Sequence, residues 1–253
     1  MKYQAVLTLF YKETLRFYKV LLQTIIAPIV TTLLFFLVFS HVMEKNITVY
    51  GGVSYSSFLI PGLIMMSVLQ NSFANSSSSF IQSKVSGNIV FVLLAPLAHF
   101  ELFLAYVMAA VLRGMVVGLG VFLVTLLFVP FHIHSVAYLL VFALIGSAIL
   151  GTMGIIAGIW ADKFDQLAGF QNFIILPLTF LSGVFYSIHT LPAFWQKLSF
   201  LNPFFYLIDG FRYAFIGHSD VAPGLSLLFA FLTLIVLSLL TIMLLKIGYK
   251  LRH

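Results

Sequence analysis

The segment Leu201–Gly217, LNPFFYLIDGFRYAFIG, decides how this chain must be arranged in a membrane. It contains six aromatic residues, yet Asp209 and Arg212 stand near its centre. From Pro203 to its end, the segment is shorter than the roughly 20 apolar residues that a helix needs to cross a bilayer. We therefore expect it to enter the apolar region and return to the side from which it came.

The two charges of this segment are three residues apart, so their side chains are neighbours on a helix. Either charge is costly to bury alone, and the cost falls when the two are paired. One interpretation is that Asp209 and Arg212 pin a short outer helix to the rest of the protein. The alternative is an ordinary interfacial salt bridge, which contributes ~0–1 kcal/mol.

Composition places the whole chain among integral membrane proteins. Of its 253 residues, 62% are hydrophobic and 8% are charged, whereas a soluble domain has about 25% charged residues. The net charge of +6 does not indicate a nucleic-acid partner, because the basic residues stand mostly at the two ends and beside apolar runs. That distribution is typical of a protein oriented in a lipid bilayer.

The apolar runs predict an all-α polytopic protein with six transmembrane helices in a single domain, 1–253. We expect an interfacial helix over 1–20, a six-span bundle over 21–245 and a tail over 246–253. The expected spans cover about 21–41, a stretch beginning near 58, 105–129, 136–161, 168–186 and 225–245.

The N-terminal arm has the pattern of an amphipathic helix over 4–19. Its apolar face is expected to hold Val6, Leu9, Phe10, Phe17 and Val20, with Gln4, Thr8, Lys12, Glu13, Arg16 and Lys19 on the polar side. A basic amphipathic helix lies in the headgroup plane. The alternative is a solvated leader that continues into the first span.

Six spans place both termini on one side of the membrane, and the basic residues indicate which side. Nine Lys and Arg fall on the side of the termini and three on the other. The positive-inside rule then places both termini in the cytoplasm. The loop 81–103 would also be cytoplasmic, and the connection 187–223 would lie outside.

The second and third spans carry polar groups that lipid would not solvate. Ser67, Asn71, Asn75 and Ser79 recur every four residues and form one stripe on a helix. Such a stripe faces other helices or a water-filled path, and the sequence leaves both roles open, as a dimer interface or a pathway. Arg113, within the third span, either snorkels to the headgroups or contacts an anionic lipid or substrate.

No catalytic or metal-binding constellation is expected. The chain has no cysteine, and His132 with His134 supplies only two of the ligands that a zinc site needs. No G-x-x-x-x-G-K-[ST] motif is present, so ATP hydrolysis would have to come from another polypeptide.

Four segments in order carry a family resemblance: FLIPGLIMMSVLQNSFANSSSSF (58–80), NIVFVLLAPL (88–97), FIILPLTFLSGVFYSIHTLP (173–192) and LNPFFYLIDGFRYAF (201–215). Together they resemble the permease subunits of bacterial ABC-2 type ATP-binding-cassette exporters over nearly the whole chain. The chain is most similar to small drug- and lipid-export permeases, including the daunorubicin-resistance type and its enterobacterial relatives.

The resemblance implies an inner-membrane permease that pairs with a second copy of itself and docks two copies of a separate ATPase, which binds ATP and Mg²⁺. This chain would hold no cofactor of its own. A cytoplasmic coupling helix between spans two and three would contact the ATPase, and outer re-entrant helices between spans five and six would cap the pathway. The implied coupling residues are Asn88, Ile89, Phe91, Val92, Leu93, Leu94, Ala95 and Pro96. The implied outer gate residues are Asn202, Pro203, Tyr206, Asp209, Gly210, Arg212 and Tyr213.

The sequence departs from many such permeases at Val90, Phe91 and Val92, where acidic residues often occur in the coupling helix. A hydrophobic or amphiphilic, drug- or lipid-like cargo is expected, and a polysaccharide or polyol chain is the alternative. A secondary transporter would need internal repeats or intramembrane acids, and a membrane enzyme would need a cluster of His, Asp or Glu. The sequence shows neither pattern.

Overall fold

The computed structural model describes residues 2–43, 48–49, 52–129 and 133–251. The α-helices in chain order are α1 (Lys2–Tyr18), α2 (Leu21–Met43), α3 (Tyr55–Val85), α4 (Ile89–Leu94), α5 (His99–Thr125), α6 (Val136–Trp160), α7 (Phe164–Phe170), α8 (Leu176–Phe180), α9 (Ala193–Phe200), α10 (Pro203–Ile216) and α11 (Pro223–Ile247). A π-helical turn, η1 (Gln171–Ile175), joins α7 to α8, and η2 (Ile188–Thr190) is a 3₁₀ turn. The strands β1 (Thr48–Val49) and β2 (Val53–Ser54) pair antiparallel before α3.

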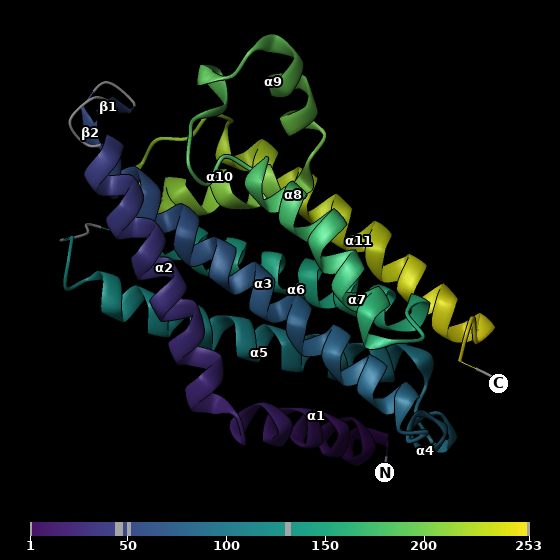
Figure 1. Cartoon of the computed structure of the whole chain (residues 1–253). Coiled ribbons are helices and arrows are strands. Elements are labelled where there is room, and N and C mark those ends of the chain that lie inside the picture. Colours follow the sequence, from purple (N-terminus) through teal and green to yellow (C-terminus); the bar gives the residue numbers. More distant parts are fainter. Residues whose placement is uncertain (1, 44–47, 50–51, 130–132, 252–253) are drawn as a thin grey trace.

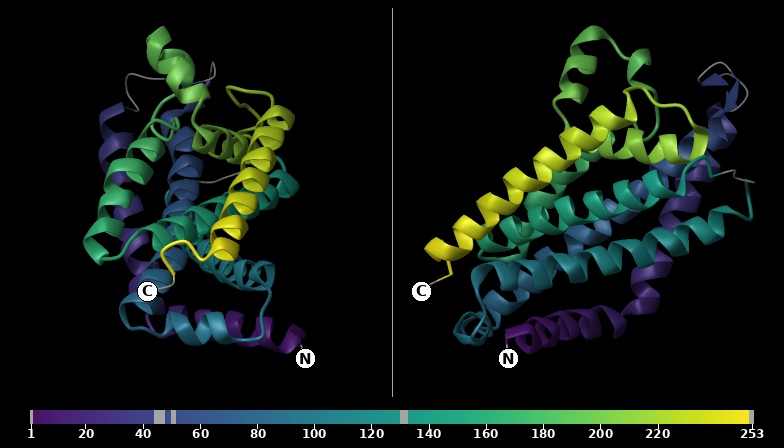
Figure 2. Two further views of the ribbon diagram at one scale, coloured as in Figure 1. Left: turned by 90° about the vertical axis from the view of Figure 1, so that its right-hand side faces the viewer. Right: turned by 180° about the vertical axis from the view of Figure 1, so that it is seen from behind.

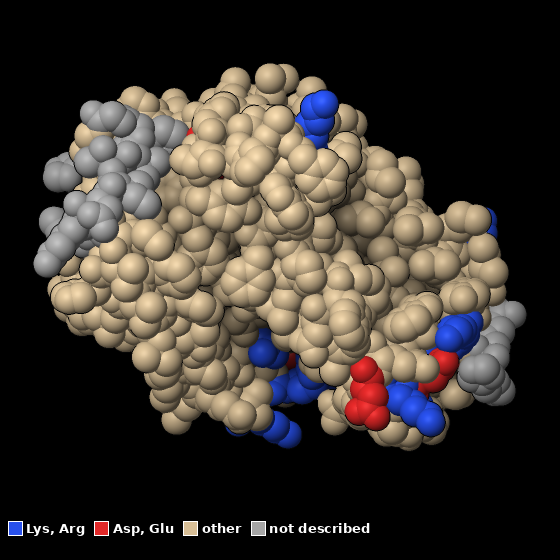
Figure 3. Space-filling model, turned by 45° about the horizontal axis from the view of Figure 1, so that its top comes forward, with Lys and Arg blue, Asp and Glu red and all other residues tan. Residues whose placement is uncertain are grey.

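The long helices form one elongated bundle with two different ends (Figures 1 and 2). One end carries α1, α4 and both chain termini, while β1, β2, α9 and α10 lie at the other. Charged side chains gather near the lower edge of the face in Figure 3, and most of the rest of that face is uncharged. This distribution is that of a protein whose middle lies in lipid.

Five helices are long and apolar enough to cross a membrane, namely α2, α3, α5, α6 and α11. The central one is α3, because 83% of its most apolar stretch is buried, against 11% in α11. It packs on α6, α5, α10 and α2. The expected all-α polytopic class is confirmed, and the short β1–β2 hairpin is the exception.

Small residues let α3 and α6 approach closely. A Cβ added at Gly154 of α6 would lie 2.6 Å from the carbonyl oxygen of Phe73, so no larger residue fits there without moving a backbone. Beside it, Ser76 and Ser77 of α3 are buried. Apolar lipid tails give little hydrophobic drive to join helices, and close packing of small residues supplies the attraction instead.

The first return loop is shorter than the sequence indicated. We expected a loop over 81–103, but α3 continues to Val85 and α5 already begins at His99. Ile81 and Ser83 are buried in contact with neighbouring helices, which keeps the last turn of α3 helical. The capping geometry of Glu101, whose carboxylate accepts from the Ala98 N–H at 2.8 Å, begins α5 early.

The expected fifth span, 168–186, is not among the five long helices. Instead α7, η1 and α8 form a continuous but interrupted helical run from Phe164 to Phe180. The π-helical turn stands directly before the α8 turn that holds Pro177, and the chain turns at Gly183, whose φ is +74°. Proline lacks the N–H that a regular helix needs, and a residue with a positive φ ends a helix. The helical run therefore stops at Phe180, six residues before Tyr186.

The N-terminal helix packs against α5, and this contact changes the expected division of its faces. Leu9 and Phe17 are buried as expected, and Val6 and Phe10 are partly buried. Val20 lies beyond the end of α1 at Tyr18 and is 47% exposed. One expectation was wrong: Glu13, expected on the polar face, is fully buried. Its carboxylate lies 3.4 Å from the Arg16 Nε and 3.6 Å from the Lys12 Nζ, and these charges offset its burial.

Candidate functional site

The short helix α4 exposes apolar side chains at the end of the molecule where the charges gather. Phe91 is 74% exposed and Leu94 is 76% exposed. Ile89 is buried against the rest of the protein and holds the helix in place. Leaving large apolar groups in water is unfavourable, so the outer surface of α4 has the character of a contact surface.

The other predicted coupling residues surround this surface. Asn88 is exposed at the start of α4 and makes no side-chain cap, Val92 and Ala95 are half-buried, and Leu93 and Pro96 are exposed. The chain leaves the helical conformation at Ala95, which has a ψ of 146°, as expected for a residue before proline. The helix α4, Ile89–Leu94, thus lies within the segment 88–96 that was named for coupling, and the coupling role itself stays a prediction.

A charged cluster that the sequence did not reveal joins three segments beside α4. The Lys84 Nζ donates to the Ile159 and Ala161 carbonyl oxygens and to Asp162 Oδ1, at 2.9, 2.7 and 3.1 Å. The Lys250 Nζ donates to the other Asp162 oxygen at 2.8 Å and to the Trp160 carbonyl at 3.0 Å. Asp162 therefore ties the end of α3 and the tail after α11 to the loop between α6 and α7.

The same contacts set the charge of Asp162. Hydrogen bonds from Lys250 and then from Lys84 hold its pKa below the usual value for an aspartate. The carboxylate is charged at neutral pH and bridges both cations. No spacing rule links positions so far apart in the sequence, so only the folded chain shows this cluster.

At the opposite end, the two charges of α10 are fully buried. Asp209 accepts hydrogen bonds from the backbone N–H groups of Asp220 and Val221, at 2.9 and 3.0 Å. These bonds fasten the loop that leads from α10 into α11. A carboxylate with two backbone donors is well satisfied even without water.

Arg212 fastens α10 in the other direction. Its Nε donates to the Phe58 carbonyl at 3.3 Å and its Nη2 donates to the Gly183 carbonyl. The guanidinium carbon lies 3.8 Å from the centre of the Phe58 ring, a cation–π contact. The two charges approach each other only to 3.9 Å. The arrangement is that of a pinned helix, and full burial excludes a solvent-exposed salt bridge.

Other predicted outer residues fix the start of α10. The Asn202 Oδ1 accepts from the Phe204 N–H at 3.0 Å and so caps the helix, while its Nδ2 donates to the Leu178 carbonyl at 2.6 Å. Pro203 occupies the first helical position, where its missing N–H costs nothing. Tyr206 stacks on Phe229 of α11, with ring centroids 4.7 Å apart.

Gly210 and Tyr213 pack against α6. A Cβ at Gly210 would lie 2.1 Å from the Phe142 ring of α6, so only glycine allows this approach. Tyr213 packs edge-on against Tyr138 and His134. His132, named with His134 as a weak metal candidate, lies outside the described residues. In the part of the chain that the structure describes, no three His, Asp or Glu side chains gather as metal ligands would.

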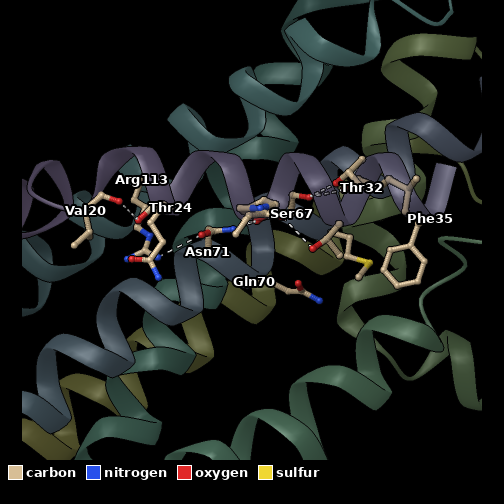
Figure 4. A pocket seen from close by; sticks show the side chains of 14 residues that line it. Val20, Thr24, Thr32, Phe35, Ser67, Gln70, Asn71 and Arg113 are labelled. Atoms are coloured by element: carbon tan, nitrogen blue, oxygen red, sulfur yellow. Dashed lines mark hydrogen bonds between the residues drawn. The ribbon is translucent and has the colours of Figure 1, made fainter. Parts of the chain in front are cut away.

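A cavity of about 440 Å³ opens between α2, α3 and α5 (Figure 4). Its walls mix hydroxyl, amide and apolar side chains with one arginine. The lining residues are Val20, Gln23, Thr24, Ala27, Pro28, Thr31, Thr32, Phe35, Leu63, Met66, Ser67, Gln70, Asn71 and Arg113. It is unusual for membrane-embedded helices to turn so many polar groups toward one space.

The polar stripe on α3 contacts neighbouring helices and also lines spaces between them, and its role at a dimer interface or pathway stays a prediction. Ser67 exchanges a hydrogen bond with Thr32 of α2 at 3.0 Å, and the Asn75 carbonyl accepts from Arg16 of α1 at 2.6 Å. Ser67 and Asn71 also line the cavity, while Ser79 lines a second space between α1 and α3. The stripe therefore holds helices together and forms cavity wall.

Arg113 points into this cavity from α5 (Figure 4). Its Nη2 lies 3.4 Å from the Asn71 side-chain oxygen, and its guanidinium lies 5.8 Å from the centre of the Phe17 ring. Its Nε is buried and has no hydrogen-bond partner among the described residues. The arrangement differs from simple snorkelling, because the charged group faces a protein-lined space.

Known proteins resemble the part of the chain that contains these features. The sequence pattern described as "ABC-2 type transporter" matches residues 4–216, which include most of α1 and all of α4, the cavity and α10. The chain belongs to the ABC-2 type transporter family. It is therefore a multi-pass membrane protein of a transport system.

Individual relatives agree with this assignment. The chain is 41% identical over 210 residues to the inner membrane transport permease YadH of Escherichia coli K12, covering 83% of this chain and 82% of the relative. It is 28% identical over 170 residues to nodulation protein J of Neorhizobium galegae, covering 66% and 64%. Nodulation protein J of Rhizobium leguminosarum bv. viciae is 23% identical over 167 residues, with the same coverage.

Proposed function

We propose that this chain is the permease subunit of an ATP-driven exporter in the bacterial inner membrane, working as a homodimer with two copies of a separate ATPase. ATP and Mg²⁺ bind to the ATPase in this proposal, and the permease provides the path. The family assignment and the similarity to an inner membrane transport permease support the class of function. The proposed roles of α4 and α10 rest on the geometry of the two ends of the bundle.

The exposed apolar surface of α4 is the observation that carries the proposal. Phe91 and Leu94 protrude at the end of the bundle that also holds both termini and the gathered charges. An apolar surface rimmed by polar groups is the usual form of a protein contact site. The proposed occupant is a groove of the ATPase, in which apolar contacts take the place of the acidic residues that many related coupling helices carry.

The distribution of basic residues supports a cytoplasmic location for this end. Lys12, Arg16, Lys84 and Lys250 lie on α1, at the end of α3 and in the tail. In this orientation α10 lies on the outer side as the proposed gate. The run α7–η1–α8 then crosses between the two ends as a sixth, shortened span, which places both termini in the cytoplasm.

The proposed mechanism begins with closure of the two ATPases, which pushes on α4. The Asp162 cluster connects the movement of α4 to the start of α7 and to the tail, because Lys84 lies three residues before the Gly87 turn that precedes α4. The displacement would then reach α2, α3 and the α7–α8 run at the interface between the two permeases. A hydrophobic or amphiphilic cargo would pass between the two copies, from the cytoplasm or inner leaflet outward.

The test is co-purification with candidate ATP-binding-cassette ATPases from the same organism. We expect the double variant Phe91→Asp, Leu94→Asp to abolish co-purification and ATP-dependent transport while membrane insertion remains normal. The matched control is Leu201→Asp, because Leu201 is 81% exposed but precedes α10 at the opposite end. Normal ATPase binding by the double variant would overturn the assignment of α4.

A further inference from the structure

We propose that the cavity between α2, α3 and α5 binds the anionic head group of a single-chain amphiphile, with Arg113 as its counter-charge. This inference rests on the proposed function, because it names the chemical class of the cargo. The shared chemistry is a phosphate or carboxylate carried on an apolar chain. Three features of the cavity carry it: an unsatisfied cation, a change of polarity along its length and a polar rim.

The described residues leave the cation largely unsatisfied. A guanidinium has five N–H donors, and within the described ranges Arg113 shows one hydrogen bond, at 3.4 Å, to Asn71. Its Nε is buried with no partner, and no acid lies within ion-pair distance of it in the described part of the chain. Glu13 is engaged with Lys12 and Arg16. A charge kept inside a membrane protein without a partner marks a place for an opposite charge.

The polarity of the cavity changes from one end to the other (Figure 4). Arg113, Thr24 and Asn71 lie together at one end, next to the junction of α1 and α2. Phe35 lies at the other end beside Thr32, whose hydroxyl is hydrogen-bonded to Ser67. Leu63 and Met66 add apolar wall to the cavity. A ligand with an anionic head and an apolar tail matches this order. A uniformly polar sugar chain does not, because its hydroxyl groups at the apolar end would be buried without hydrogen-bond partners.

The rim of the cavity is polar where a lipid-facing surface should be apolar. Gln23 and Thr31 of α2 are exposed, and Gln70 of α3 is half-exposed. Amide side chains are costly in hydrocarbon, so these residues need water, a polar ligand or a second copy beside them. The rim therefore gives a polar head group a route into the cavity.

The size and position of the cavity favour a small amphiphile over a bilayer phospholipid. Its volume of about 440 Å³ lies in the lower half of the range of small-molecule sites, roughly 300–1,000 Å³. The charged end lies beside α1, the helix expected in the headgroup plane. An amphiphile held there has its head at the level of the proposed inner leaflet and its tail directed toward the middle of the bundle.

The experiment measures equilibrium binding of radiolabelled dodecyl phosphate to the purified full-length protein in phosphatidylcholine nanodiscs, with empty nanodiscs as background. We expect saturable binding that unlabelled dodecyl phosphate displaces and dodecylphosphocholine, with the same chain and no net charge, does not. Inorganic phosphate should not compete, because it lacks the tail. Including phosphatidylglycerol in the nanodiscs should not compete either.

Variants tie the binding to the cavity. Arg113→Gln should weaken binding of dodecyl phosphate by about tenfold or more, the effect of losing a charge-assisted contact, and Arg113→Lys should retain part of it. The matched control is Lys197→Gln, which removes one cation from α9 at the other end of the bundle. Gln70→Leu changes the rim and leaves the charged end intact, and it should weaken binding by about threefold. This second variant keeps the proposal testable if Arg113→Gln does not fold.

Four results would overturn the inference. Binding unchanged in Arg113→Gln and Gln70→Leu would remove the site from this cavity. Equal displacement by dodecylphosphocholine would remove the preference for an anion, and competition by inorganic phosphate alone would remove the role of the tail. Competition by phosphatidylglycerol would assign the site to a bilayer lipid. None of these measurements requires the ATPase, so failure of the proposed coupling at α4 would be seen separately.

Discussion

The two short helices at opposite ends of the bundle invert what their sequences suggest about burial. The helix α4 consists of IVFVLL and exposes most of its apolar side chains, whereas α10 contains an aspartate and an arginine that are both fully buried. The difference lies in the available partners. Asp209 and Arg212 meet backbone N–H and carbonyl groups of neighbouring segments, while Phe91 and Leu94 are left mostly exposed by the residues that the structure describes.

This comparison separates a helix whose polar groups are satisfied within one chain from one that we propose to be a docking surface. All of the charges of α10 are directed at the protein itself, so the helix is a rigid part of the fold. The exposed surface of α4 is directed away from the described protein, and under the proposed function its apolar groups would be covered by the ATPase. Substitutions at the two helices should therefore affect different measurements.

The largest expected effect on stability comes from Asp209→Ala. Removing the carboxylate leaves the Asp220 and Val221 N–H groups without their acceptor and takes the Asp209 charge away from the buried Arg212. Breaking a buried charged network by removing one member costs about 3–5 kcal/mol. The measurement is thermal unfolding of the purified protein in detergent, and Asp209→Asn, which retains one acceptor, should lose less.

Exchanging Asp209 and Arg212 tests whether the two charges act mainly on each other or on their backbone partners. If Asp209 and Arg212 acted mainly as a pair, the double variant Asp209→Arg, Arg212→Asp would regain the lost stability. We expect no recovery, because the N–H groups that face position 209 and the carbonyls that face position 212 require their present partners. Recovery in the unfolding assay would show that the pair matters more than its backbone contacts.

The next largest effect is expected for Arg212→Lys. Lysine keeps the charge but cannot reach the Phe58 and Gly183 carbonyls together while stacking on the Phe58 ring. The loss of one charge-assisted hydrogen bond costs about 1.5–3 kcal/mol. Unfolding in a graded detergent or urea series measures this loss, and Lys197→Arg at exposed α9 provides a control with no expected change. An unaltered transition in Arg212→Lys would contradict the importance of the planar group.

A smaller effect is expected for Asp162→Asn in the charged cluster beside α4. The neutral side chain weakens the contacts of Lys84 and Lys250, but the aspartate is solvent-accessible and salt screens such pairs. We expect a modest loss of stability that disappears at high salt, together with a larger loss of transport. Equal transport by the variant and the natural chain would show that the cluster does not transmit motion.

The contribution of Asp162 should also depend on pH in a defined direction. Because its pKa is lowered in the folded protein, its stabilising effect is fully present above the unfolded value of 3.8 and is lost as the pH falls through the folded value. Between pH 5 and pH 8 this residue should contribute no pH dependence. Unfolding measured across pH 2–8 for the natural chain and Asp162→Asn isolates the effect as the difference between the two curves.

The smallest effect on stability is expected at α4. Phe91→Ser and Leu94→Ser remove exposed side chains, and surface substitutions of this kind change stability by less than about 0.5 kcal/mol. Ile89→Ser, at the buried position of the same short helix, is the matched comparison and should be clearly more destabilising. If Phe91→Ser proved as destabilising as Ile89→Ser, the outer surface of α4 would be part of the fold and not a docking surface.

Hydrophobic patterning was enough to predict the long helices but not where helical runs are interrupted. The five apolar helices and α4 fall close to their expected positions, and Asn202 and Pro203 mark the start of α10 as their types predict. The expected fifth span was wrong at its end, because the π-helical turn near Pro177 and the turn at Gly183 depend on local backbone geometry. The burial of Glu13 could not be predicted from an amphipathic pattern, because it depends on how α1 packs against α5 and on the nearby Lys12 and Arg16.

The sequence by itself determined that this is a membrane protein with long apolar helices, and that the segment around Asp209 and Arg212 is too short to cross. It did so because hydropathy and length are properties of contiguous residues. Only the tertiary structure decided which groups satisfy the charges, that Asp162 joins Lys84 to Lys250, and that Arg113 faces a cavity. These contacts join residues far apart in the chain, and their free energy depends on packing that no local pattern encodes.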